Sequence, residues 1–388
     1  MILTFVGHYL PGFRAGGILR TIVNTVDNLS DEFDFRIVTR DRDLGDHQPY
    51  ADVVSNKWDV VGKSMVYYLS PERLNLRVLE ELITSTEHDI IYLNSFFDPF
   101  TIKVLFLRKL KKFPSTPVIV APRGEFAWAS LKLKYPKKIV FISIARLIGL
   151  YLKVRWHSSS EYESEDIINI MKIDPSLIHV ALDLPSRILS DPSSESSAKT
   201  IFNPNSLKIV FLSRISREKN LDYAIKVLNG VRANVTFDIF GPAEDKKYWD
   251  ECKELIKRLP VNINVNYLGS ANPLNVLNIF GQYDLFLFPS GGENYGHVIA
   301  ESLISGTPVL ISDKTPWKDL QKENYGWDIS LDRIDSFTEV IDSYASLSIS
   351  ERLKKRKSII ERIEKRLFSS IVLEANKSLF FNEIECSM

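Results

Sequence analysis

Short apolar runs alternate with longer amphipathic segments along the whole chain. In the first half, the apolar runs predict strands at Ile2–Val6, Phe35–Thr39, Asp89–Leu93 and Val118–Ala121. The amphipathic segments predict helices at Gly17–Leu29, Glu72–Thr84, Pro99–Lys111 and Lys137–Leu152. Because these strands are apolar throughout and helices separate them, we expect a parallel sheet that is covered on both faces.

The pattern stops in a stretch rich in Pro, Ser and Asn, which is typical of a linker, and then restarts. Further strands are expected at Leu207–Leu212, Val235–Phe240, Ile263–Leu268, Asp284–Phe288 and Pro308–Ile311, and helices at Asn220–Leu228, Ala243–Arg258 and His297–Ile304. We therefore predict an α/β protein with two doubly wound domains, residues 1–185 and 207–350, joined by the linker 186–206. Residues 351–388 form a charged helical tail, either solvated or packed back on the first domain. The charge run Glu351–Lys357 is interpreted as a solvated helix face.

The composition excludes several classes of protein. The 388 residues carry 49 Lys and Arg against 49 Asp and Glu, and this balance disfavours a nucleic-acid binder. Cys252 and Cys386 are too far apart in the sequence to suggest a disulfide scaffold or a zinc site. No uncharged apolar run reaches the ~18 residues of a membrane span, and the short apolar N-terminus lacks the basic start of a signal peptide. We expect a cytoplasmic protein.

Three motifs follow predicted strands. The first, Gly7–Gly17, is a glycine-rich loop before a helix, where Gly16 and Gly17 would let the backbone approach a phosphate. It is not a GxGxxG pattern, and a tight turn is the alternative. The second, Leu212–Asn220, contains Arg214 and Lys219, which can bind phosphate oxygens at the carboxyl end of a strand. Its alternative is a charged surface loop.

The third motif, Pro289–Glu301, is the most informative. A glycine-containing loop leads into a helix near His297, with Glu293 in the loop and Glu301 about one turn into the helix. Two carboxylates so placed can accept hydrogen bonds from hydroxyl groups on different parts of one extended ligand. The apolar residues on either side of Glu301 disfavour a purely surface role.

Together, the glycine-rich first loop, the Arg-x4-Lys pair and the Glu-x7-Glu pair resemble the retaining glycosyltransferases of family GT4. The continuation Gly306–Asp313 also matches that family. The resemblance implies the GT-B fold, in which two Rossmann-like domains face a central cleft. It implies that Arg214 and Lys219 bind the donor diphosphate, that Glu301 binds the ribose and that Glu293 contacts the transferred sugar.

The resemblance also places Gly17 opposite the β-phosphate. The predicted donor-binding residues are Gly16, Gly17, Arg214, Lys219, Asn294, Tyr295, Gly296, His297 and Glu301, and the predicted catalytic residues are Glu293, Arg214, Lys219 and Arg123. Many relatives have a histidine where Arg123 stands. Because an arginine cannot exchange a proton near neutral pH, Arg123 either stabilises negative charge or is structural.

No metal or cofactor is expected. The six histidines show no ligand spacing, and the acidic pair Asp41 and Asp43 is interpreted as a solvated turn. Arg214, Lys219 and the N–H groups of two helix N-termini would stabilise the charge on a nucleotide-diphosphate leaving group without a metal.

The resemblance thus implies a retaining, metal-independent glycosyltransferase with a nucleotide-diphosphate sugar as donor. The resemblance implies a lipid-linked saccharide as acceptor, within surface polysaccharide assembly: O-antigen of lipopolysaccharide, capsule or exopolysaccharide. The alternatives are a sugar-nucleotide 2-epimerase of the same fold and a non-catalytic, two-lobed ligand-binding protein.

Residues 101–156 are strongly basic, because they contain thirteen Lys and Arg and a single acidic residue, Glu125. Apolar and aromatic residues are interleaved with these charges. A basic amphipathic surface binds anionic lipid headgroups, so this segment predicts peripheral contact with the inner face of the membrane. The alternative is that the apolar residues are core and the lysines solvate the backs of helices.

Overall fold

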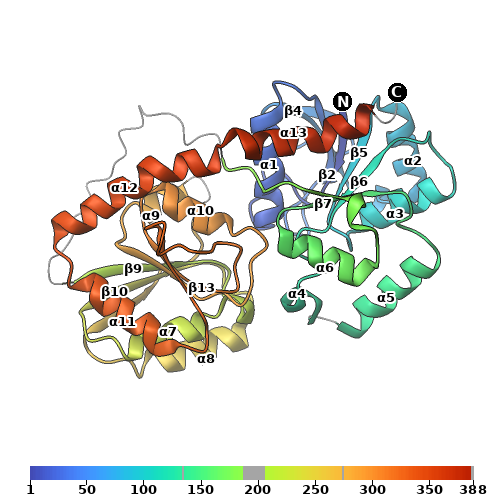
Figure 1. The fold of residues 1–388 in the computed structure, drawn as a ribbon. Coiled ribbons are helices and arrows are strands. Elements are labelled where there is room, and N and C mark those ends of the chain that lie inside the picture. Colours follow the sequence, from blue (N-terminus) through green and yellow to red (C-terminus); the bar gives the residue numbers. More distant parts are fainter. Residues whose placement is uncertain (133–134, 187–205, 273–274, 386–388) are drawn as a thin grey trace. The chain divides into compact units, whose positions relative to one another are not determined.

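The computed structural model describes residues 1–132, 135–186, 206–272 and 275–385 (Figure 1). It consists of two compact units. The N-terminal unit contains residues 1–187 and 368–388, and the C-terminal unit contains residues 188–367. The expected tail is therefore divided between the units, since the C-terminal unit continues well past residue 350.

The N-terminal unit is built on an eight-stranded sheet in the order β3-β4-β2-β1-β5-β6-β7-β8. All neighbours are parallel except β3, which runs antiparallel to β4. The strands are β1 (Ile2–Phe5), β2 (Phe35–Arg40), β3 (Trp58–Val61), β4 (Ser64–Leu69), β5 (Ile90–Asn94), β6 (Val118–Ala121), β7 (Arg155–Ser158) and β8 (Ile178–Val180). The helices are α1 (Gly17–Leu29), α2 (Leu76–Ser85), α3 (Pro99–Lys109), α4 (Trp128–Lys132), α5 (Tyr135–Leu147), α6 (Glu161–Met171) and α13 (Ser370–Glu385).

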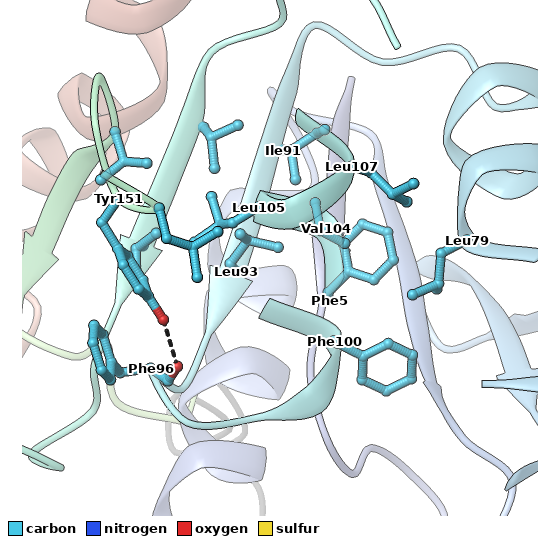
Figure 2. Packing of buried hydrophobic residues seen from close by; sticks show 14 of the residues in the cluster. Phe5, Leu79, Ile91, Leu93, Phe96, Phe100, Val104, Leu105, Leu107 and Tyr151 are labelled. Atoms are coloured by element: carbon cyan, nitrogen blue, oxygen red, sulfur yellow. Dashed lines mark hydrogen bonds between the residues drawn. The ribbon is translucent and has the colours of Figure 1, made fainter. Parts of the chain in front are cut away.

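Helices cover both faces of this sheet. On one face, α2, α3, α5 and α6 pack against a large apolar cluster, part of which is drawn in Figure 2. There the Phe96 ring stacks on Tyr151 at 4.3 Å between centroids. The Tyr151 hydroxyl donates a hydrogen bond of 2.9 Å to the Phe96 carbonyl, which fixes the loop after α5 to the end of β5 (Figure 2).

The other face of the sheet is covered by α1 and by α13, the last helix of the chain (Figure 1). Phe380 of α13 is fully buried, with ring centroids 5.4 Å from both Phe33 and Tyr92. The Asn376 side chain donates to the Leu182 carbonyl at 2.8 Å. The end of the chain is thus part of the N-terminal core.

The C-terminal unit has a six-stranded, fully parallel sheet in the order β11-β10-β9-β12-β13-β14. Chain order and sheet order match the doubly wound dinucleotide-binding arrangement, which confirms the predicted fold class. The strands are β9 (Leu207–Leu212), β10 (Val235–Phe240), β11 (Ile263–Tyr267), β12 (Leu285–Phe288), β13 (Val309–Ser312) and β14 (Gly326–Ile329). The helices are α7 (Leu221–Asn229), α8 (Lys246–Ile256), α9 (Val276–Phe280), α10 (His297–Ile304), α11 (Ile334–Ala345) and α12 (Ile349–Leu367).

Helix α12 corrects part of the interpretation of the charge run as a solvated face, because three of its charged side chains are exposed but Arg352 and Arg356 contact the unit. The Arg352 side chain is buried and lies 3.5 Å from the buried Asp284 carboxylate. Burial raises the pKa of Asp284, although the backbone N–H of Lys208 and the Arg352 guanidinium oppose this shift. Arg356 donates to the carbonyls of Gly281 and Ser305 at 2.8 and 2.7 Å. Two cations of the run therefore hold the helix against its unit.

Within the described residues, no helix is both long and apolar enough to cross a membrane.

Replacing Phe380 with Ala should destabilise the N-terminal unit by about 3–5 kcal/mol, because it leaves a cavity between α13 and the sheet. The loss would be measured as faster amide hydrogen exchange in β1, β2 and β5 of the full chain. Ile371→Ala is the matched control on the same helix, since Ile371 is 79% exposed. Equal exchange rates in the two variants would contradict the packing of α13.

Candidate functional site

Two of the predicted motifs follow neighbouring strands of the C-terminal sheet, β9 and β12. β9 pairs in parallel with β12, with Ile209 opposite Leu285 and Val210 opposite Phe286. The loops that follow them, residues 213–220 and 289–296, therefore start at the same edge. The strand order reverses between β9 and β12, and open α/β sheets bind their ligands at this point of the carboxyl edge.

Hydrogen bonds join the two loops into one structure. The Gly291 N–H donates to the Glu218 carbonyl at 2.7 Å, and the Asn220 side chain donates to the Pro289 carbonyl at 2.9 Å. Asn220 has a φ of 53°, a left-handed conformation that Asn tolerates better than most residues. This conformation suits an asparagine at position 220.

An ion pair connects two predicted catalytic residues across these loops. Lys219 Nζ lies 2.7 Å from Glu293 Oε1, and both side chains are largely buried. The Ser290 hydroxyl donates to the same carboxylate oxygen at 2.7 Å. A lysine and a hydroxyl thus fix Glu293 on one oxygen, and such charge-assisted hydrogen bonds are stronger than neutral ones.

Arg214 lies in the loop after β9, but its side chain is 47% exposed. It stands 3.9 Å from the equally exposed Glu244, and a pair of this kind contributes little stability in water. The guanidinium can therefore exchange this partner for a phosphate at low cost.

The N-terminus of α10 lies at the end of the loop after β12. Gly296 precedes it with a φ of 82°, and an added Cβ there would lie 2.9 Å from Ile299 Cδ1. No side chain caps the helix, so its first N–H groups suit an anion. The Trp317 indole donates to the Tyr295 carbonyl at 2.7 Å and fixes the loop. Glu301 is half-buried, one turn along α10.

The glycine-rich loop of the N-terminal unit lies between β1 and α1. Gly16 has a φ of 66°, a left-handed backbone conformation that favours glycine. An added Cβ would meet no atom within 4 Å, so steric crowding is not the reason for glycine there. Gly17 is exposed and begins α1. The Asp43 carboxylate accepts hydrogen bonds from the N–H groups of Phe13, at 2.9 Å, and Arg14, at 3.2 Å.

The interpretation of Asp41 and Asp43 as a solvated turn is therefore wrong, since both are almost fully buried. Asp41 accepts hydrogen bonds from the Ser55 hydroxyl at 2.7 Å and from Arg42 Nε at 2.8 Å. The two carboxylates hold loops of the unit together. No local sequence pattern indicates this role, because Phe13 and Arg14 are about thirty residues from Asp43.

Arg123 lies in a buried polar network at the carboxyl edge of the N-terminal sheet. Its guanidinium donates to Asp183 Oδ1 at 2.9 Å, to Asn94 Oδ1 at 2.9 and 3.1 Å, and to the Tyr92 hydroxyl. The Tyr92 hydroxyl in turn lies 2.7 Å from His157 Nδ1. These contacts favour the structural alternative, and a catalytic role for Arg123 stays a prediction.

Burial dominates the electrostatics of this network. It lowers the pKa of Arg123, but Tyr92 and Asp183 outweigh it, so the net shift is upward. Burial, reinforced by the Arg123 charge, lowers the pKa of His157 to about 3. His157 is thus neutral at physiological pH.

The segment that contains the paired loops resembles a known protein family. Residues 192–366, which carry the paired loops, match the family model described as glycosyl transferases group 1. This part of the chain is similar to the group 1 glycosyltransferases.

Relatives and solved structures agree with this assignment. An uncharacterized 41.2 kDa protein in the cps region of Klebsiella pneumoniae is 23% identical over 270 residues, 69% of this chain and 72% of that protein. The chain spans less than half the length of the other curated relatives, for example 44% of a Streptococcus agalactiae N-acetylglucosaminyltransferase subunit.

Anabaena HepE, solved with UDP and glucose, superimposes with a TM-score of 0.70 at 15% identity over 100% of this chain and 99% of that one. WaaG, a glycosyltransferase involved in lipopolysaccharide biosynthesis, gives a TM-score of 0.66 at 13% identity over 98% of each chain. These likenesses show that the chain has the GT-B fold.

In the part of the chain that the structure describes, no three His, Cys, Asp or Glu side chains gather where they could hold a metal ion. Metal independence stays a prediction.

The free energy of unfolding of the N-terminal unit should fall as the pH drops below about 6.5, the ordinary pKa of histidine. Below that value the unfolded chain protonates His157, while the folded chain keeps it neutral down to a pH of about 3. The loss is about 1.4 kcal/mol per pH unit. His157→Gln should remove this component, measured as denaturant unfolding of both proteins between neutral pH and pH ~5. Parallel pH profiles would contradict a buried, neutral His157.

Proposed function

We propose that this group 1 glycosyltransferase transfers a sugar from a nucleotide-diphosphate sugar to a saccharide acceptor with retention of anomeric configuration and without a metal. The observation that carries the proposal is the Lys219–Glu293 ion pair at the switch point of the C-terminal sheet. It places a cation suited to phosphate and a carboxylate suited to sugar hydroxyls on adjoining loops.

The charge that develops in the reaction explains the basic residues. When the bond between the anomeric carbon and the diphosphate oxygen breaks, its electron pair stays on the diphosphate. Lys219, Arg214 and the uncapped N–H groups at the start of α10 can stabilise this charge. These groups would do the work that a divalent cation does in metal-dependent transferases.

Retention requires that the acceptor oxygen bonds to the anomeric carbon on the face that the diphosphate leaves. We propose that the acceptor proton passes to an oxygen of the departing phosphate. Glu293 then positions the sugar instead of attacking it. Lys219 and Ser290 both bind Oε1 and draw charge from the carboxylate, which makes it a weaker nucleophile, while Oε2 can accept a sugar hydroxyl.

The acceptor side of the proposal is a lipid-linked saccharide in surface polysaccharide assembly, used by a cytoplasmic enzyme at the inner face of the membrane. Two of the comparisons support it: the Klebsiella relative is described as lying in a cps region, and WaaG as acting in lipopolysaccharide biosynthesis. The alternatives are a 2-epimerase and a two-lobed binding protein, neither of which would release a nucleoside diphosphate in step with acceptor glycosylation.

Lys219→Ala and Glu301→Ala should each lower the transfer rate by about 100-fold or more, because each removes a contact to the donor. Release of nucleoside diphosphate from a panel of UDP-, GDP- and ADP-sugars measures the rate. Lys253→Ala is the matched control, since Lys253 lies exposed on α8. If either variant turned over normally while folded, as judged by circular dichroism, the donor site would be misplaced.

Transfer should continue at an undiminished rate in excess EDTA, because side chains and helix N–H groups neutralise the leaving group. The same release assay, run with and without the chelator, measures this. Loss of activity in EDTA that magnesium or manganese restores would show that a metal is required.

A further inference from the structure

Helix α5 is apolar on two opposite faces, and its own unit covers one of them. Ile142 and Ala145 are buried against the core. Val140, Ile144 and Leu147 recur at intervals of four and three residues on the outward face, where Leu147 is 87% exposed. Ile148 and Leu152, beyond the end of the helix, extend this exposed surface.

Two exposed aromatic side chains lie before and at the start of α5. Trp128 and Tyr135 are both exposed, and their rings contact each other edge to face at 5.7 Å between centroids. Exposed apolar side chains that gather on one element are more informative than scattered ones, because large exposed apolar areas mark interaction sites. We call these seven residues the α5 surface: Trp128, Tyr135, Val140, Ile144, Leu147, Ile148 and Leu152.

An open groove of about 560 Å³ adjoins the α5 surface, between the ends of α5 and α6. Its lining is apolar at Leu147, Leu152 and Met171 and cationic at Arg146 and Lys172, with no acidic residue among the lining side chains. The groove thus combines an apolar floor with two cations.

The basic residues near the groove fall into two groups. Arg108 donates to the carbonyls of Leu152 and Lys153 at 3.2 and 2.7 Å, so it holds the loop after α5 in place. Arg146 and Lys172, in contrast, have no ion-pair partner among the residues that the structure describes. Their charges are available to an external anion.

We propose that the α5 surface and its groove dock this protein on an anionic lipid bilayer. The apolar side chains enter the boundary between headgroups and acyl chains, and Arg146 and Lys172 bind lipid phosphates. Charge complementarity favours this occupant over a second copy of the chain, because a two-fold contact would bring Arg146 and Lys172 close to like charges. The inference rests on the proposed function, in which the acceptor is held at a membrane.

Not every basic residue of the predicted segment is available to a lipid phosphate. Lys138, one of the basic residues of the predicted segment, donates to the Ser130 carbonyl at 2.7 Å and lies over the Phe97 ring. Lys134 lies outside the described residues. Arg146 and Lys172 are the sharper targets, and Lys172 falls beyond the segment 101–156.

The test is co-sedimentation of the full chain with vesicles of phosphatidylcholine, alone or mixed with an equal amount of phosphatidylglycerol. Binding to the anionic vesicles should be at least about 10-fold tighter and should weaken with salt. Arg146→Glu with Lys172→Glu should abolish this preference, and Leu147→Ser with Leu152→Ser should weaken binding about 10-fold. Matched controls in the C-terminal unit are Lys253→Glu and the exposed Val261→Ser, which should bind like the unaltered protein.

Several results would overturn the proposal. These are equal binding to both vesicle types, no binding to either, or unchanged binding of the charge-reversal variant. A dimer in sedimentation velocity that Leu147→Ser disrupts would assign the surface to a second copy instead. Release from vesicles by inorganic phosphate at an ionic strength where chloride has no effect would assign the two cations to a free phosphate site.

Vesicle binding is measured without any nucleotide sugar, so it can fail independently of catalysis. The groove variants should still release nucleoside diphosphate with a water-soluble saccharide acceptor. Vesicle binding without any sugar transfer would contradict the proposed function and leave the docking surface intact.

Discussion

The Lys219–Glu293 ion pair is the interaction on which the organisation of the C-terminal unit depends. Charged side chains that are largely buried need a partner, and these two meet at 2.7 Å only because β9 and β12 are neighbours in the sheet. The pair fixes the two loops relative to each other. The same loop geometry delivers Gly296 and the start of α10 to the carboxyl edge. One compact set of loops can therefore bind both phosphate and sugar groups.

The N-terminal unit uses buried carboxylates in a similar way. Asp43 holds the glycine-rich loop, and Asp183 binds both the Arg123 guanidinium and the Thr21 hydroxyl of α1 at 2.9 and 2.8 Å. Internal partners thus satisfy these polar groups at the carboxyl edge of the sheet. The outward face of α5 is different, because its apolar side chains are not buried by the rest of their unit.

Local patterns predicted the elements that carry the proposed donor site. The helices Gly17–Leu29 and His297–Ile304 have the bounds expected from periodicity and glycine signals, and β9 coincides with the expected strand. The predicted helix at Lys137–Leu152 ends early, and the polar strand β7 was missed, because pairing within a sheet overrides a weak strand pattern.

Roles that depend on distant partners could not be predicted from the sequence. Asp43 and Arg352 look like surface charges in the sequence, and only tertiary contacts show that they are buried. For Arg123 the sequence left a catalytic and a structural role open. For Leu147 the sequence left membrane contact and core packing open, and only the structure shows that the side chain is exposed. Sequence patterns therefore indicated which residues carry chemistry, while the structure decided which of them support the fold.

The most direct test of the donor site is a thermal shift measurement with nucleoside diphosphates. A ligand that binds only the folded protein raises its melting temperature by mass action. At least one of UDP, GDP and ADP should stabilise the unaltered protein and Lys253→Ala equally, but should have little effect on Lys219→Ala. Full stabilisation of Lys219→Ala would contradict the assignment of the paired loops as the diphosphate-binding site.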